Sequence, residues 1–392
     1  MMTGSDLLIP MRALLAGARR KQSALLDLTG RLVRLESPSD DKAGVDACVA
    51  LAAAHAKDLG GRVKIHRHRL FGDVFEARFG PAAAKASASQ RILLLGHLDT
   101  VWPLGTLKTM ACRVGDGRLW GPGTLDMKAG VAMAFTAIEI LIESNALRRE
   151  IVMLLNSDEE VGSTVSRPYT ERLATECSAV YVLEPAQGLA CKTARKGTGN
   201  WRIEVKGVAA HAGVDFEKGA NAIRELARLI ETVSSWTNLK RGITVSVDVA
   251  GGGTRANVIP AHAWAEVDGR ISRRADGPRL ERTFAALKPV DKRCSLAVAG
   301  GINRPPMERT RANLKLYRQA RTLAAELGFQ LDEAATGGAS DGNFTSALGI
   351  PTLDGLGAVG EGAHAHHESV LIEHLAPRTA LLAGLCAASG TT

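Results

Sequence analysis

Short runs of aliphatic residues alternate with helix-spaced segments over the first half of the chain. Residues 91–95 (RILLL), 151–155 (IVMLL) and 179–183 (AVYVL) are typical of buried strands. Residues 22–59 place apolar side chains at helical spacing, and residues 128–144 (KAGVAMAFTAIEILIES) predict a mostly buried helix. Strands that alternate with helices are typical of a largely parallel sheet with both faces covered. We therefore predict an α/β fold built on a mostly parallel sheet.

The pattern changes after residue 196, where strands with alternating polar and apolar residues begin. We expect an antiparallel sheet and two helices there, with strands in 201–213, 243–252 and 263–272 and helices in 219–236 and 278–288. From about Leu314 the buried α/β pattern resumes. The sequence therefore predicts an α+β domain at 197–303, inserted into a first domain that comprises 1–196 and 304–392.

Polar side chains follow each of the three buried strands. They are His97 and Asp99 after the first strand, Asp158, Glu159 and Glu160 after the second, and Glu184 after the third. Ligands of parallel α/β sheets bind just beyond the carboxyl ends of the strands. Three consecutive carboxylates would also repel one another unless a positive charge lay among them. This combination predicts a cation site at the end of the sheet.

The types of these residues indicate which cation. Carboxylates that gather with histidine and without cysteine suit a divalent transition metal such as zinc. Asp126, Glu160 and Glu184 carry three negative charges, so two zinc ions would leave room for one bridging hydroxide. Taken singly, His97 could belong to a capped turn and Asp126 could cap the helix that follows it. Their joint placement at strand ends favours the metal site.

Composition narrows the class of protein. A chain of 392 residues exceeds the size of a single core, which favours two domains. The net charge of +8 is spread along the chain, so we expect anionic small molecules as ligands and no nucleic acid. Six cysteines without a CxxC pair indicate a reducing compartment, and we expect a cytoplasmic protein without a membrane span.

Eight short motifs between Gly96 and Glu368 carry a family resemblance. In chain order they are GHLDTVWP, GPGTLDMKAG, NSDEEVGS, LEPA, AAHAG, GGGTRANVIP, GGASDGNF and GAHAHHES. Their order and spacing resemble the zinc aminoacylase/carboxypeptidase family of dinuclear metallo-exopeptidases, and within it the glutamate carboxypeptidases. The resemblance implies two Zn²⁺ per subunit, with Co²⁺ or Mn²⁺ as replacements.

The resemblance also implies a role for each residue at the strand ends. His97 and Glu184 would hold one ion, Glu160 and His364 the other, and Asp126 would bridge them. Asp99 would orient His97. Glu159 would be the general base that takes a proton from the attacking water and passes it to the leaving nitrogen.

The last histidine ligand has two competitors in the same motif. GAHAHHES contains His364, His366 and His367, and the family places its ligand four or five positions before a glutamate. His364 lies four positions before Glu368 and fits this spacing. We expect His366 and His367 to be local surface or pocket residues.

For the inserted domain, the resemblance implies a dimer contact and substrate-binding residues. His211 would reach the active site of the partner subunit and polarise the scissile carbonyl. Asn257 and Arg270 would bind the terminal carboxylate of the substrate. Without the resemblance, Arg270 would be an ordinary strand residue and Asn257 a turn former. Three further candidates for the substrate pocket are Lys192, Arg304 and Gly338.

These expectations define one reaction and several alternatives. We predict a homodimeric zinc hydrolase that cleaves an amide next to a free carboxylate, in a small amino-acid conjugate or short peptide, and releases a glutamate-type amino acid. Deacylation or desuccinylation of N-acyl amino acids is the alternative within the same chemistry. A catalytically silent binding protein would be expected to have lost Glu159 or a ligand, and a nucleic-acid-binding protein would show salt-sensitive binding to DNA or RNA.

Overall fold

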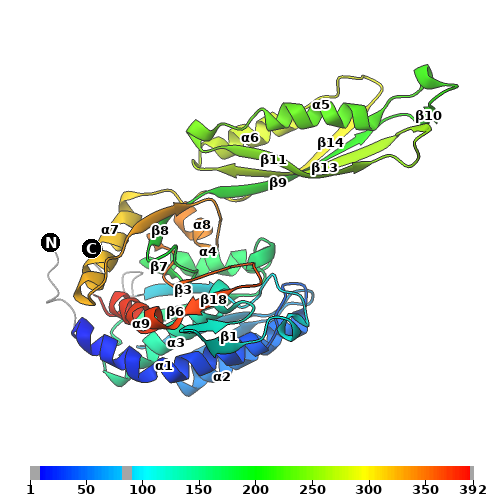
Figure 1. The fold of residues 1–392 in the computed structure, drawn as a ribbon. Coiled ribbons are helices and arrows are strands. Elements are labelled where there is room, and N and C mark those ends of the chain that lie inside the picture. The colour runs from blue at the N-terminus through cyan, green and yellow to red at the C-terminus, as the bar shows by residue number, and fades with distance from the viewer. Residues whose placement is uncertain (1–8, 82–90, 389–392) are drawn as a thin grey trace. The chain divides into compact units, whose positions relative to one another are not determined.

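The chain folds as two compact units. The computed structural model describes residues 9–81 and 91–388. The first unit comprises Met1–Ala194, Arg309–Ala335 and Ser340–Thr392, and the second comprises Arg195–Glu308 and Thr336–Ala339 (Figure 1). Because the chain returns to the first unit after the second, the second unit is an insertion in the sequence.

A six-stranded sheet forms the centre of the first unit. Its order is β1-β2-β6-β3-β7-β16, with the bounds β1 (Arg62–His66), β2 (Val74–Phe79), β6 (Glu150–Asn156), β3 (Arg91–His97), β7 (Ala179–Val182) and β16 (Thr352–Leu353). The last four strands of this order pair in parallel, and β1 and β2 pair antiparallel at one edge. The mostly parallel sheet is as predicted. Strands β1 and β2 were not predicted, because charged residues interrupt their apolar ones (RVKIH, VFEARF).

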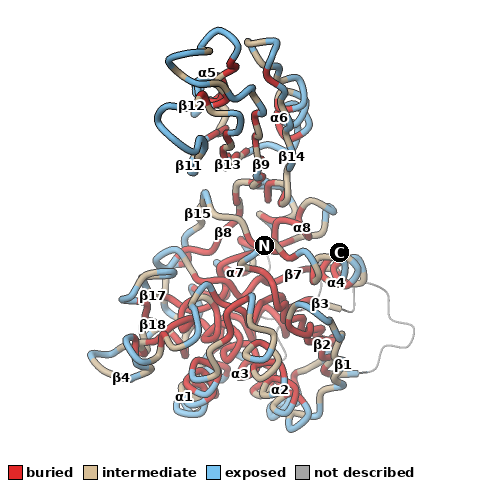
Figure 2. The backbone as a smooth tube through the Cα atoms, turned by 90° about the vertical axis from the view of Figure 1, so that its right-hand side faces the viewer, coloured by how far each residue is buried: buried red, intermediate tan, exposed pale blue. Residues whose placement is uncertain are grey.

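Helices cover both faces of this sheet. They are α1 (Met11–Arg34), α2 (Lys42–Asp58), α3 (Ala129–Glu143), α4 (Arg167–Thr175), α7 (Arg311–Glu326), α8 (Gly342–Ala347) and α9 (Ile372–Ala387). Side chains alternate along a strand, so Leu94 of β3 packs with α3 and α9 while its neighbours Leu93 and Leu95 pack with α4 on the opposite face. The buried backbone accordingly concentrates in the middle of the unit (Figure 2).

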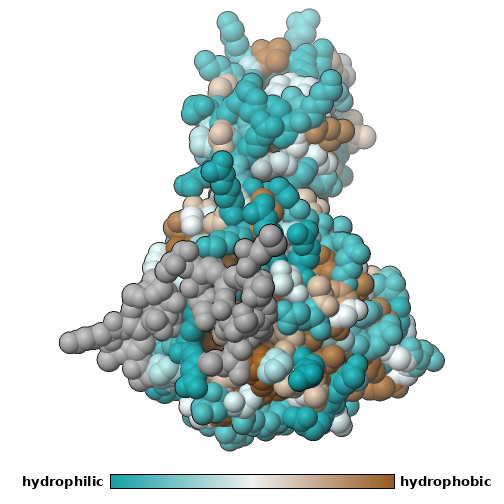
Figure 3. Space-filling model, turned by 90° about the vertical axis from the view of Figure 1, so that its left-hand side faces the viewer, coloured by the Kyte–Doolittle hydropathy of each residue, from teal (hydrophilic) through white to brown (hydrophobic). Residues whose placement is uncertain are grey.

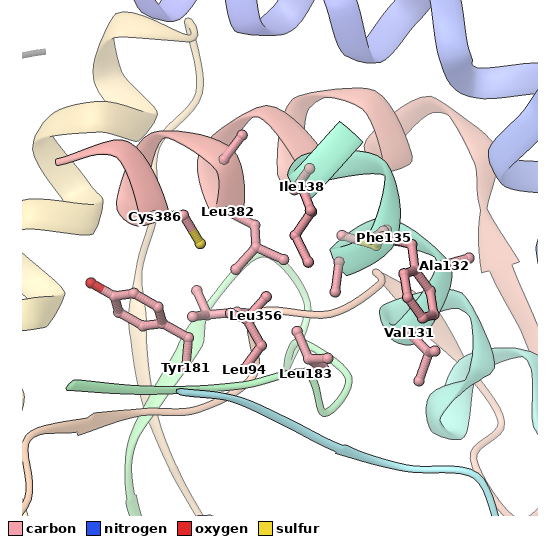
Figure 4. Packing of buried hydrophobic residues seen from close by; sticks show 14 of the residues in the cluster. Leu94, Val131, Ala132, Phe135, Ile138, Tyr181, Leu183, Leu356, Leu382 and Cys386 are labelled. Atoms are coloured by element: carbon pink, nitrogen blue, oxygen red, sulfur yellow. The ribbon is translucent and has the colours of Figure 1, made fainter. Parts of the chain in front are cut away.

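Helix α3 contributes much of the core on one face. Ile138 points from α3 toward Leu94 of the sheet and lies beside Leu382 of α9 (Figure 4). Phe135 packs against Phe75 of β2, with ring centroids 6.3 Å apart. Twelve of the fifteen helix residues are buried, which accounts for the nearly continuous apolar run that predicted this helix.

Two isoleucines of α3 offer a matched test of this packing. Ile138 is fully buried, whereas Ile142, one turn further along, is 40% exposed. We expect Ile138→Ala to lower the free energy of unfolding by about 2–5 kcal/mol, because the deleted atoms leave a cavity. Ile142→Ala should cost less than about 1 kcal/mol. Urea unfolding followed by circular dichroism checks this, and equal losses would contradict the packing.

A small antiparallel sheet in the first unit holds the turn that carries the three candidate histidines. Its order is β17-β18-β5-β4, with β4 (Arg113–Gly115), β5 (Arg118–Trp120), β17 (Gly360–Glu361) and β18 (Ser369–Leu371). The turn between β17 and β18 contains the motif GAHAHHES, so the pairing of these two strands holds the three candidate histidines on one closed turn.

The second unit is a four-stranded antiparallel sheet with two helices. The sheet order is β11-β13-β9-β14, and the elements are β9 (Gly197–Lys206), β11 (Thr244–Gly252), β13 (His262–Ile271), β14 (Ser295–Arg304), α5 (Ala222–Ser234) and α6 (Asp276–Ala285). Trp201 of β9 stacks on Phe284 of α6, with ring centroids 4.2 Å apart. The face of this unit that Figure 3 shows is largely hydrophilic. Strand β14 was not predicted, because alanine and glycine separate its few large apolar residues (SLAVAGGINR).

Two pairs of short strands complete the fold. β8 (Cys191–Arg195) pairs with β15 (Glu333–Thr336), and β10 (Ala210–His211) pairs with β12 (Val258–Ile259). Within the described part of the chain, every helix falls short of the length and apolarity that a bilayer span requires.

Candidate metal centre

The predicted site residues gather at the carboxyl ends of three adjacent strands. His97 is the last residue of β3, which lies between the parallel strands β6 and β7. Glu159 and Glu160 follow β6 on a single 3-10 turn, and Glu184 follows β7. The fourth element is the segment before α3, which carries Asp126.

Asp126 lies between two pairs of side chains. One carboxylate oxygen, Oδ1, is 3.2 Å from His97 Nε2, and this nitrogen is 3.6 Å from Glu184 Oε1. The other oxygen, Oδ2, is 3.3 Å from His364 Nε2, and this nitrogen is 3.4 Å from Glu160 Oε2. Each oxygen of one carboxylate therefore faces its own histidine–glutamate pair.

The electrostatics of this group favour a bound cation. Burial raises the pKa of Glu160 to about 7, and the neighbouring charge of Asp126 adds to this effect. The Asp126 and Glu160 carboxylates raise the pKa of His364 to about 10. Burial alone would raise the pKa of Asp126, but the two imidazoles hold it well below its ordinary value. The negative charge of the carboxylates is therefore balanced by the imidazoles, at the place where a bound metal would supply positive charge.

An unused ligand atom supports the same conclusion. Glu160 Oε1 is buried and has no hydrogen-bond partner among the described residues, which is costly for a carboxylate oxygen. The ligand atoms of His97, Asp126 and Glu160 lie within 4.8 Å of one another, and so do those of His97, Glu159 and Glu184. Imidazole nitrogens and carboxylate oxygens without sulfur are a donor set that zinc accepts. The residues present therefore fit divalent zinc.

Asp99 contacts more of the site than the sequence indicated. His97 Nδ1 is 2.9 Å from the backbone carbonyl oxygen of Asp99 and 3.5 Å from its carboxylate. The fully buried carboxylate accepts hydrogen bonds from the backbone N–H groups of Glu159 and Glu160, both at 3.1 Å. Asp99 therefore holds His97 largely through its main chain, and it holds the Glu159–Glu160 turn through its side chain.

Ser39 completes this arrangement and was missed in the sequence. Its Oγ donates a hydrogen bond of 2.7 Å to Asp99 Oδ2. Ser39 lies in the connection between α1 and α2, sixty residues before Asp99, and no local pattern marks it as part of the site. Asp158, by contrast, accepts hydrogen bonds from Val165 and Ser166 and stabilises the turn itself.

The turn between β17 and β18 presents its three histidines differently. His364 has a positive φ of 61° and reaches Asp126 and Glu160. His366 is exposed, with its ring centroid 5.6 Å from that of Trp102, and His367 is exposed as well. Of the three, the structure brings only His364 to the carboxylates in the described interactions.

The predicted substrate residues are divided between the units. Lys192 belongs to the first unit, where its backbone pairs with Asp354. The others belong to the second unit: His211, Asn257, Arg270, Arg304 and Gly338.

Within the second unit, these residues fall into two places. Ala212, next to His211, donates its backbone N–H to the carbonyl of Asn257 at 3.0 Å, so the two predicted residues lie on neighbouring segments. The Arg270 guanidinium donates a hydrogen bond of 2.9 Å to the carbonyl of Gly337 and pairs with Asp268. Gly337 directly precedes Gly338 in the chain, so Arg270 and Gly338 belong to the same place. Arg304 is buried at the end of β14.

Comparison with known proteins agrees with the motifs and the fold. The family model "Peptidase family M20/M25/M40" matches residues 93–388. Carboxypeptidase G2 of Pseudomonas sp. (strain RS-16) is 27% identical over 359 residues, which cover 90% of this chain and 85% of that protein. Succinyl-diaminopimelate desuccinylase of Stenotrophomonas maltophilia (strain R551-3) is 28% identical over 378 residues, covering 90% and 96%.

A solved structure shows the same architecture. Aminopeptidase PepT from Bacillus cereus ATCC 10987 superposes with a TM-score of 0.78 at 22% identity, covering 94% of this chain and 99% of that one. The resemblance inferred from the motifs is thereby confirmed. The chain belongs to peptidase family M20/M25/M40, and the predicted class of metallo-exopeptidase is confirmed with it.

Proposed function

We propose that this chain is a dinuclear zinc hydrolase that cleaves an amide bond adjacent to a free carboxylate and releases a glutamate-type amino acid. The observation that carries the proposal is the placement of the two Asp126 oxygens, each facing a separate histidine–glutamate pair. His97 and Glu184 would hold one ion, Glu160 and His364 the other, and Asp126 both. Bound zinc would supply Lewis acidity toward the carbonyl and lower the pKa of the attacking water.

Glu159 is the proposed general base. Its backbone is fixed by Asp99, its side chain is buried, and its carboxylate lies in one group with His97 and Glu184. Glu160, the next residue, faces His364 instead. Glu159 would take a proton from the attacking water and deliver it to the amide nitrogen as the carbon–nitrogen bond breaks, so no proton is gained or lost overall.

The second unit would complete the site in a homodimer. His211 Nδ1 accepts hydrogen bonds from the backbone N–H groups of Gly213 and Val214, at 3.1 and 3.2 Å. In a neutral imidazole the proton must then be on Nε2, which could donate to the carbonyl oxygen of the substrate in the partner subunit. Val214 and Phe216 near His211 are 77% and 64% exposed, as expected of a surface that another subunit covers.

The substrate carboxylates are assigned to polar residues that the sequence singled out. Arg270 and Asn257 would bind the terminal carboxylate, because a guanidinium matches its geometry. Gly338 would let the backbone approach the substrate. Lys192 and Arg304 would bind an acidic side chain and so favour glutamate over neutral amino acids.

N-acyl amino-acid deacylation, including desuccinylation, is the second candidate. It is supported by the succinyl-diaminopimelate desuccinylase, which matches this chain at an identity similar to that of carboxypeptidase G2. The two candidates share the metal centre and the base. Desuccinylation differs in that the recognised carboxylate lies on the acyl half of the amide.

A hydrolysis screen tests the proposal and separates the candidates. The substrates are N-acyl glutamates, aspartates and neutral amino acids, together with N-succinyl amines, each assayed with and without a chelator. We expect chelator-sensitive hydrolysis, with kcat/KM about 10- to 150-fold higher for glutamate than for neutral leaving groups, since a lost contact to a charged group costs about 1.5–3 kcal/mol.

Each other outcome has a defined meaning. Preference for the N-succinyl group regardless of the leaving amine would favour desuccinylation. If protein that carries two zinc ions bound one of these substrates tightly but did not hydrolyse it, the proposed hydrolase activity would be overturned and a binding protein indicated.

A further inference from the structure

We infer that Glu368 is a positioning residue that sets the separation between the turn carrying His364 and the segment carrying Asp126. The inference rests on the proposed dinuclear centre. In the sequence Glu368 was only a landmark for choosing among the histidines. In the structure it is fully buried, although nothing in its local sequence (HHESV) indicates a core position.

The Glu368 carboxylate accepts four hydrogen bonds. Oε1 accepts from the backbone N–H groups of Leu125 and Asp126, at 2.8 and 3.0 Å. Oε2 accepts from the backbone N–H of Gly123 at 2.9 Å and from Trp102 Nε1 at 2.8 Å. An ionised carboxylate offers about four acceptor positions, so all of them are used. Three of the four donors belong to the segment that carries the proposed bridging ligand.

Glu368 is also fixed relative to His364. Its backbone N–H donates to Ala365 at 2.9 Å, and Ala365 donates to Gly362 at 2.8 Å. The pairing of Glu361 with Ser369 closes the same turn. These backbone hydrogen bonds tie Glu368 to the turn that carries His364. Any displacement of the Glu368 carboxylate from its donors would therefore displace His364 from Asp126.

The donors require a carboxylate and not an amide. Each group that donates a hydrogen bond to the Glu368 carboxylate is an N–H. Three of them come from residues 123–126 of one backbone segment, and neighbouring backbone N–H groups of this kind bind anions. Glutamine has the same shape, but its NH₂ group would face two of these N–H groups whichever way the amide turned. Glu368→Gln therefore disturbs the hydrogen bonds between Glu368 and the segment of Asp126, with almost no change in side-chain volume.

Glu361 provides the matched control. It lies on the same turn, seven residues earlier, but it is exposed and pairs with Arg118 at 2.9 Å. Glu361→Gln makes the identical chemical change without touching the segment of Asp126. A general effect of lost charge on zinc binding would appear in both variants, whereas a positioning effect would appear only at Glu368.

The test measures zinc and cobalt binding to the full chain. We expect Glu368→Gln to weaken zinc binding about 10- to 100-fold in competition with a chromophoric chelator, as for other residues that orient ligands. The visible absorption of the Co²⁺-loaded variant should also change, because the ligand geometry changes. Glu361→Gln should match the wild type in both measurements.

Other results for Glu368 would contradict a positioning role. Wild-type affinity and an unchanged Co²⁺ spectrum in Glu368→Gln would overturn it. If that variant does not fold, Glu368→Asp decides, since the shorter side chain keeps the charge but cannot reach all four donors, and wild-type zinc binding there would overturn the inference. A wild-type chain that binds no zinc would instead overturn the proposed centre itself.

Discussion

Glu159→Gln will lower kcat by about 10²- to 10⁴-fold and leave both zinc ions in place. Glutamine keeps the size and the backbone hydrogen bond of Glu159 to Asp99, so the turn after β6 should not move. It cannot accept a proton from the attacking water at neutral pH. The proposed reaction therefore loses its proton carrier while the carboxylate and imidazole ligands stay where they are.

The neighbouring residue supplies the control for this experiment. Glu160 Oε2 lies 3.4 Å from His364 Nε2, and the other oxygen of Glu160 is buried with no hydrogen-bond partner in the part of the chain that the structure describes. We expect Glu160→Gln to lose zinc as well as activity, since an amide is a much poorer zinc ligand than a carboxylate. Zinc content is measured by elemental analysis and kcat with the best substrate of the screen. Full activity in Glu159→Gln, or equal loss of zinc in both variants, would contradict the assignment of the base.

The strand-end part of the site could be predicted because it depends on a local pattern. A buried parallel strand is a short aliphatic run, so the polar residue that ends it is visible in the sequence, as with His97 after RILLLG and Glu184 after AVYVL. The geometry of parallel sheets then brings these ends together. Asp126 had no such signal, since it lies in an irregular segment before α3. It was counted among the carboxylates of the site, but its bridging role came from the family resemblance.

The supporting contacts could not be predicted, because they join segments that are distant in the chain. Glu368 and Leu125 are 243 residues apart, and Ser39 and Asp99 are 60 apart. A buried acid among histidines looks like a surface residue until the backbone N–H groups around it are known. Strand β14 was missed for a different reason: alanine and glycine separate its few large apolar residues (SLAVAGGINR), and it is an edge strand that is hydrogen-bonded to β9 alone.

His364→Ala will remove at least one zinc ion and most of the activity, whereas His366→Ala and His367→Ala will keep both. The three residues share one turn and one chemistry, so the set is internally controlled. His364 Nε2 is within 3.4 Å of both Asp126 and Glu160, while His366 lies against Trp102 and His367 is exposed. Loss of one ligand from a zinc site with few protein ligands leaves the ion weakly held.

Zinc content after dialysis against a weak chelator, and kcat for each variant, check this prediction. Addition of free imidazole separates a missing ligand from a distorted turn, because a small ligand can enter the gap that His364→Ala leaves but cannot restore a displaced backbone. Partial recovery of zinc and activity with imidazole is therefore expected for His364→Ala. If His366→Ala or His367→Ala lost zinc and His364→Ala did not, the ligand would be another histidine, and the turn would have to adopt a different conformation to bring that histidine to Asp126.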